Sequence, residues 1–208
     1  MKTRVPESPI VMRRAPSQNR SRMMVSVILE SATRVLAETG WSKFTTNQVA
    51  SIAGVSIGSL YQYYPNKLAL AEAIRQQHLE DILQVLDACN RQKPNVTNEL
   101  QLTDRVEGLI DGIVAVHLIN PNLHRILLEE VPLSERNVHQ NFELLYANHY
   151  LNFTTQILGE DSPRNKVVSK ILASTIEGVM HNAARHGELK SSEIKQELML
   201  LICSYLKN

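Results

Sequence analysis

Residues 45–67 have the sequence TTNQVASIAGVSIGSLYQYYPNK. This stretch predicts two short helices, over 46–53 and 57–63, because each carries apolar residues at helical spacing and Gly54 lies between them. Two short helices joined by a glycine turn are typical of the helix-turn-helix motif. Residues 45–64 are therefore the candidate functional motif of this chain.

Residues at the helix ends support these boundaries. Thr45 and Gln48, three residues apart, form a capping-box pattern for the first helix, and Ser56 can cap the second. Pro65 ends the second helix, and Asn66 can cap the long helix that follows.

The second short helix is suited to contact with DNA. A helix of this size enters the major groove, where its first residues reach base edges. It begins with Ile57, Gly58 and Ser59, so the backbone can approach closely, a thymine methyl can be contacted and a hydroxyl can hydrogen-bond. Lys67 at the start of the next helix and Thr46 at the start of the first one can contact phosphates.

The remaining sequence also predicts helices, and no segment alternates as a bounded strand would. We expect an all-α protein of about nine helices, in which a three-helix DNA-binding domain precedes a larger helical domain for ligand binding and dimerisation. The first helix ends at Gly40, and Ser162 and Pro163 begin the eighth. The further helices are expected over 22–39, 67–89, 99–119, 122–131, 134–158, 163–186 and 191–206.

The charge is divided unevenly along the 208 residues. Residues 1–67 carry nine lysines and arginines and three acids, a net charge of +6, and residues 68–208 carry a net charge of −5. Such an asymmetry indicates a polyanionic partner for the N-terminal part only. Residues 1–20 are expected to be a flexible basic arm, which either contacts DNA or is a solvated tail.

The run AGVSIGSLYQYYPNK at 53–67 resembles the DNA-binding domain of the tetracycline-repressor (TetR-type) transcriptional regulators. The resemblance extends over roughly residues 20–82 and includes Trp41 and Phe44. It implies a domain at 21–67 that binds DNA, followed by a variable domain at 68–208 for effector binding and dimerisation. One departure is Tyr64, where the family often has phenylalanine, and a buried ring there needs a partner for its hydroxyl.

The resemblance implies two sets of DNA contacts. Phosphate contacts are implied for Thr46, Tyr61, Tyr63 and Lys67, and contacts at or beside the bases for Ile57, Gly58, Ser59 and Gln62. We include Asn47, next to Thr46, among the DNA-binding candidates, whereas Val49, Ala53 and Leu60 are expected in the core.

The larger domain shows no catalytic signature, so we expect neither an enzyme nor a bound cofactor. Aromatic residues at helical spacing over 142–153 form one stripe, which is either ordinary core or a wall of an effector pocket. All seven histidines lie in this domain, but their spacings do not predict a metal site. The candidate pocket residues are His117, His124, Phe142, Tyr146, His149, Tyr150 and Phe153.

The last two helices are suited to a four-helix dimer interface, which the resemblance also implies, although an intramolecular core is compatible with the same pattern. Candidate interface residues are Ile171, Thr175, Gly178, Val179, Ile194, Leu198, Leu201 and Tyr205.

We therefore expect a cytoplasmic homodimeric repressor that a small organic effector releases from a palindromic double-stranded DNA operator. The chain shows neither a signal peptide nor an apolar run long enough to cross a membrane, and its two cysteines, Cys89 and Cys203, lack metal-ligand spacing. One alternative is an α-helical metal-binding protein or enzyme with a vestigial helix-turn-helix. Another is a dimeric interaction protein that does not bind DNA.

Overall fold

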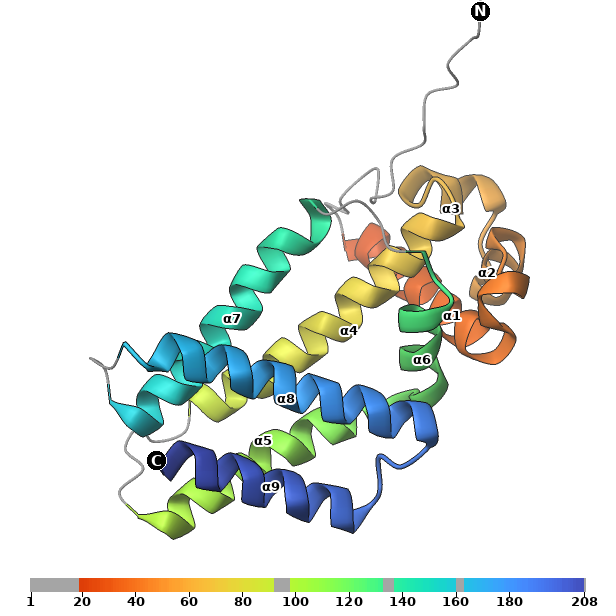
Figure 1. Ribbon diagram of the computed structural model, residues 1–208. Helices are drawn as coiled ribbons and strands as arrows, with labels where there is room; N and C mark the ends of the chain where they lie inside the picture. Colours follow the sequence, from red (N-terminus) through yellow and green to blue (C-terminus); the bar gives the residue numbers. More distant parts are fainter. Residues whose placement is uncertain (1–18, 92–97, 133–136, 160–162, 208) are drawn as a thin grey trace, which may run out of the picture. The chain divides into compact units, whose positions relative to one another are not determined.

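The computed structural model describes residues 19–91, 98–132, 137–159 and 163–207, without the side chains of 137–143 (Figure 1). Across these residues every regular element is a helix, which confirms the all-α prediction. None of the described helices is long and apolar enough to cross a membrane. The nine helices in these ranges are α1 (Asn19–Lys43), α2 (Thr46–Ala53), α3 (Ile57–Tyr63), α4 (Lys67–Asn90), α5 (Glu99–Ile119), α6 (Pro121–Glu129), α7 (Asn137–Leu158), α8 (Asn165–His186) and α9 (Ser192–Lys207).

The first of two compact units contains the helix-turn-helix. It takes the chain up to His78 together with Arg125–Ser134, so it holds α1, α2, α3, the beginning of α4 and the end of α6. Helix α2 packs against both α1 and α3. The largest side chains fully buried in this unit are Ile28, Leu36, Phe44, Leu60, Tyr64, Leu70 and Ile74.

Helix α1 is kinked at Gly40, where the sequence predicts its end. Gly40 has φ 71° and ψ 167°, a conformation that favours glycine. A Cβ atom at this position would also lie 3.1 Å from Oε2 of Glu130, the oxygen that accepts a hydrogen bond from the Trp41 amide at 3.0 Å. The backbone conformation therefore favours glycine here, and a larger residue would also displace the Glu130 carboxylate slightly.

A buried ion pair within α4 also reaches the end of α6. Arg75 Nη1 lies 2.6 Å from Glu72 Oε2, and its Nη2 donates to the Leu127 carbonyl at 2.9 Å. Because Arg75 is buried and charged, losing its Leu127 acceptor would be costly, so this contact helps to hold the end of α6 to α4.

The second unit comprises Leu79–His124 and Glu135–Asn208. It includes the second part of α4, α5, the start of α6, and α7, α8 and α9 (Figure 1). Helix α8 packs on α5, α7 and α9, and α5 also packs on α9. Helix α5 approaches α4 closely at Gly112, where an added methyl group would overlap the Val85 side chain, whereas Gly108 one turn earlier faces open space.

Several ends of the predicted helices differ from the structure, and α6 ends at Glu129 rather than at residue 131. Helix α1 begins at Asn19, so the last two residues of the expected arm are helical, while residues 1–18 lie outside the described part of the chain. Helix α8 begins at Asn165 rather than Pro163, without a side-chain cap from Arg164, and Ser162 is not described.

Candidate nucleic-acid interface

The start of α2 is fixed by the predicted capping box. The Thr45 amide donates to Gln48 Oε1 at 3.1 Å, and the Gln48 amide donates to Thr45 Oγ1 at 3.3 Å. At the other end of α2, Gly54 adopts the left-handed conformation with φ 66°. These local contacts fix where α2 begins and ends.

Helix α3 is only seven residues long, yet it has two distinct faces. Ser56 caps its N-terminus by accepting a hydrogen bond from the Ser59 amide at 3.0 Å. Leu60 and Tyr63 point into the core of the unit, three residues apart on one face. The opposite face carries the exposed residues Ile57, Gly58, Tyr61 and Gln62.

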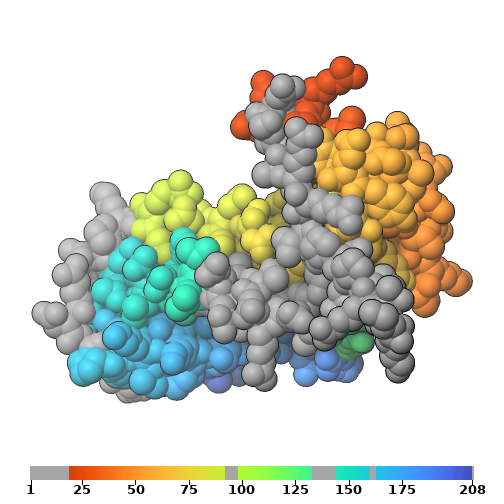
Figure 2. Space-filling view, turned by 90° about the horizontal axis from the view of Figure 1, so that it is seen from above, coloured from red at the N-terminus to blue at the C-terminus, as the bar shows by residue number. Residues whose placement is uncertain are grey.

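A contact between hydroxyl groups connects α2 with α3. Thr46 Oγ1 lies 3.0 Å from Tyr61 Oη. Thr46 is half-buried and its neighbour Asn47 is exposed, so the start of α2 and the outer face of α3 share one surface. In the space-filling view the segment containing both helices, in orange, lies at the molecular surface (Figure 2).

Two predicted contact residues already have partners inside the unit. Lys67 Nζ donates to the Trp41 carbonyl at 3.2 Å and lies 4.1 Å from the centre of the indole ring. Ser59 is half-buried, and its Oγ lies 2.8 Å from the Ser56 hydroxyl. Both groups are therefore held in place by contacts within their own unit.

Tyr63 and Tyr64 are placed in the core. Tyr63 is 8% exposed, so most of this predicted phosphate contact is covered by its own unit. Tyr64 is fully buried, and among the described residues its hydroxyl finds no hydrogen-bond partner. Burial raises the pKa of Tyr64 to about 12.

The sequence matches two family models that together cover most of both units. Residues 28–74 match the model described as "Bacterial regulatory proteins, tetR family". Residues 101–206 match "Tetracyclin repressor-like, C-terminal domain", which alone covers half of the chain. This chain belongs to the tetR family. The matches agree with the fold, because the first contains α2 and α3 and the second contains α6–α8 and nearly all of α5 and α9.

Individual proteins and solved structures are also similar to this chain. The chain is 28% identical over 145 residues to the nucleoid occlusion factor SlmA of Haemophilus influenzae strain PittGG, which covers 67% of this chain and 62% of that protein. The fold is shared with a TetR transcription regulator from Haloarcula marismortui (TM-score 0.69, 18% identity, 89% and 97% of the two chains). It is also shared with a TetR-family regulator from Streptomyces coelicolor (TM-score 0.68, 20% identity, 90% and 98%).

The aromatic stripe of α7 lies in the core of the second unit. Tyr150 and Phe153 are fully buried and Tyr146 is 8% exposed. The Tyr146 hydroxyl donates to that of Tyr150 over 3.4 Å, and burial raises the pKa of both phenols. His149 lies elsewhere, with Nδ1 3.9 Å from Asp87 Oδ1 on α4. The side chain of Phe142 is outside the described residues.

The candidate interface residues divide between surface and core. Ile171, Gly178 and Leu201 are exposed, and Ile171 lines a shallow depression on α8 together with Thr175. Leu198 is 4% exposed and belongs to the core of its own unit, which leaves little of it for a partner. Partly buried residues at this end of the fold are Thr175, Val179, Ile194 and Tyr205.

A cluster of histidines in the second unit is not predicted by sequence spacing. The ring centre of His124 lies 4.4 Å from that of His117 and 4.5 Å from that of His181. His117 and His124 are buried, and burial lowers the pKa of His117. Burial, with His117 and Arg185 nearby, lowers the pKa of His181 to about 4. The three residues come from α5, α6 and α8, so no single helical period relates them.

Proposed function

We propose that this chain is a sequence-specific DNA-binding transcriptional repressor. The observation that carries the proposal is the outer face of α3, where Ile57, Gly58, Tyr61 and Gln62 are exposed on a helix capped and anchored by its own unit. An exposed apolar side chain among polar ones suits a surface that meets both thymine methyl groups and phosphates. The +6 net charge of residues 1–67 supports an anionic partner.

In this proposal each contact residue has one of two tasks. Ile57, Gly58, Ser59 and Gln62 lie at or beside the bases, and Thr46, Asn47, Tyr61 and Lys67 bind the backbone. Tyr63 contributes by positioning α3, since most of its surface is covered. We assign DNA binding to 21–67 with a basic arm at 1–20, and effector binding and dimerisation to 68–208, in a regulator that acts in the cytoplasm.

We infer that the regulator acts as a homodimer on a palindromic operator. The supporting observation is the apolar surface on the last two helices, where Val167, Ile171, Leu200 and Leu201 are between 45% and 62% exposed. Light scattering of the purified chain tests this. Ile171→Lys with Leu201→Lys should give monomers, and Leu100→Lys, which removes an even more exposed leucine from α5, should leave a dimer.

A small organic effector is proposed for the second unit. The feature that supports it is the pair of buried phenols, Tyr146 and Tyr150, because polar groups within an apolar core are typical of ligand sites. Effector binding would shift the DNA-binding equilibrium by about 1–3 kcal/mol.

Fluorescence anisotropy tests the main proposal directly. Labelled DNA from immediately upstream of the protein's own gene is titrated with the chain at two salt concentrations, with scrambled DNA as the control. Selective, saturable binding that weakens steeply with salt supports a DNA-binding regulator. If genome-wide selection also yields no preferred sequence, sequence-specific binding is excluded.

A further inference from the structure

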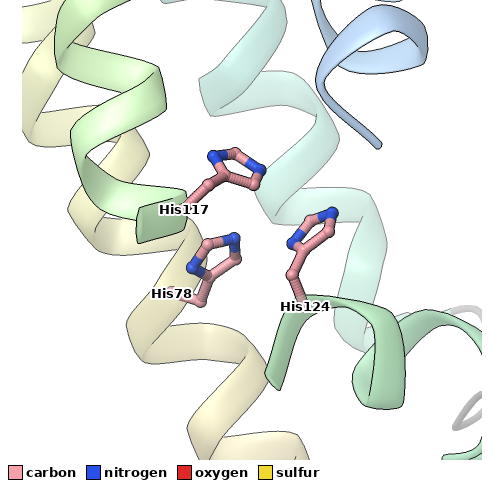
Figure 3. A group of neighbouring side chains, drawn as sticks. All are labelled: His78, His117 and His124. Atoms are coloured by element: carbon pink, nitrogen blue, oxygen red, sulfur yellow. The ribbon is translucent and has the colours of Figure 1, made fainter. Parts of the chain in front are cut away.

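We propose that His117, His124 and His181 form a binding site for a divalent transition-metal ion such as Zn²⁺. The proposal concerns the second unit alone and goes beyond the proposed organic effector. Figure 3 shows the first two rings close together, His117 from the end of α5 and His124 from α6. His78, also drawn there, is the last residue of the DNA-binding unit.

Two of the three ring separations are close to what coordination to one ion requires, and the third is wider. A tetrahedral zinc ion with Zn–N distances of about 2.0–2.1 Å separates the centres of two histidine rings by roughly 5 Å. Here the separations are 4.4 Å, 4.5 Å and, between His117 and His181, 6.4 Å. Nitrogen atoms of His117 and His124 already lie within 4.8 Å of each other, and metal binding requires the His181 ring to move closer to His117.

The environment of His117 is that of a typical metal ligand. Its Nδ1 lies 2.8 Å from the Ile113 carbonyl oxygen, and because a carbonyl only accepts, Nδ1 carries the proton. Nε2 then carries the lone pair. Histidine ligands commonly donate their second ring nitrogen to a backbone carbonyl in this way.

The donor set indicates the class of ion. Three neutral imidazoles favour zinc, copper or nickel over calcium or magnesium, which prefer oxygen ligands. Arg185, the cation beside His181, is exposed, so solvent screens its repulsion of a bound ion. Three protein ligands leave the fourth position of a tetrahedral ion for water or another small ligand.

Metal titration of the full chain tests the site without DNA, so its failure is distinct from failure of the proposed function. Chelator-treated protein is titrated with Co²⁺, followed by optical absorption, and Zn²⁺ is then added as competitor. We expect one Co²⁺ per chain with tetrahedral nitrogen ligation, displaced by Zn²⁺. At free Zn²⁺ 100 times its Kd, the unfolding equilibrium constant should fall about 100-fold.

Single substitutions identify the ligands. His117→Asn, His124→Asn and His181→Asn should each weaken Co²⁺ binding at least ~10-fold, because each removes a ligand. His186→Asn is the matched control, since His186 is exposed on α8 and its Nδ1 bonds the Asn182 carbonyl of the same helix. Circular dichroism establishes that each variant is folded, and half-buried His181 is the substitution expected to disturb packing least.

Three results would overturn the proposal. One is the absence of stoichiometric Co²⁺ binding to the folded wild type. Another is an equal loss of affinity in His186→Asn. The third is a thiolate-to-cobalt absorption band, which would place the ion on Cys89 or Cys203 instead.

Discussion

The hydroxyl groups of Thr46 and Tyr61 lie 3.0 Å apart, although fifteen residues separate them in the sequence. One group stands at the first residue of α2 and the other on the outer face of α3, so the contact fixes the two helices relative to each other. It also presents two hydroxyls side by side at the surface proposed to meet the DNA backbone.

Removing either hydroxyl should therefore weaken DNA binding without changing sequence preference. We expect Thr46→Val and Tyr61→Phe each to cost about 1 kcal/mol, roughly fivefold in Kd, because each loses one hydrogen bond to a phosphate. The double variant should cost less than the sum, because contacting residues are energetically coupled. Anisotropy against operator and scrambled DNA measures these effects. Thr103→Val, on α5 in the other unit, is the control, and an equal loss there would contradict the assignment.

Lys67 is expected to have both a structural and a DNA-binding role. Lys67→Met should make the dependence of log K on log salt shallower by about 0.9, the value for one phosphate contact. It should also change the emission of Trp41, the single tryptophan, by removing the cation above its ring. Lys43→Met, which removes an exposed charge from the same unit, should leave the fluorescence unchanged. A changed emission with an unchanged salt slope would limit Lys67 to a structural role.

Tyr64→Phe should stabilise the protein by about 1 kcal/mol, because it removes a buried hydroxyl that has no partner among the described residues. Since the pKa of Tyr64 is raised to about 12, folding favours the neutral phenol. Wild-type stability is therefore intact below the unfolded pKa of about 10 and falls as the pH rises from there towards 12. Urea denaturation at pH 7 and at about pH 10.5–11, which lies within that range, measures the free energy of unfolding of both proteins. The stability advantage of the phenylalanine variant should be larger at the higher pH. A variant less stable than wild type at both pH values would show that the hydroxyl is satisfied.

Two glycines one turn apart in α5 should respond oppositely to alanine. Gly112→Ala should destabilise by about 1–3 kcal/mol, because its methyl group overlaps Val85. Gly108→Ala should stabilise by about 1 kcal/mol, because open space surrounds it and alanine is the better helix former. Thermal unfolding of the two variants measures the difference. Similar shifts of both midpoints would contradict the close approach of α4 and α5.

The sequence predicts the ends of α2 and α3 well, because local capping signals fix them. Thr45, Gly54 and Ser56 act as expected, because capping contacts involve only neighbouring residues. The burial of Tyr63 is harder to predict. A helix of seven residues has too few apolar positions to show which of the neighbouring tyrosines faces the core. The histidine cluster could not be predicted, because it depends on how α5, α6 and α8 pack.

The DNA-binding unit is not a continuous segment of the chain. Residues 79–124 form an insertion between its two pieces, and the second piece supplies the Leu127 carbonyl to Arg75 and the Glu130 carboxylate to Trp41. A fragment cut after His78 would therefore expose the buried Glu72–Arg75 pair, remove the Leu127 carbonyl from Arg75, and lose stability. Recombination that exchanges the second unit in such a protein must keep Arg125–Ser134 together with the N-terminal part, because the two units alternate along the chain.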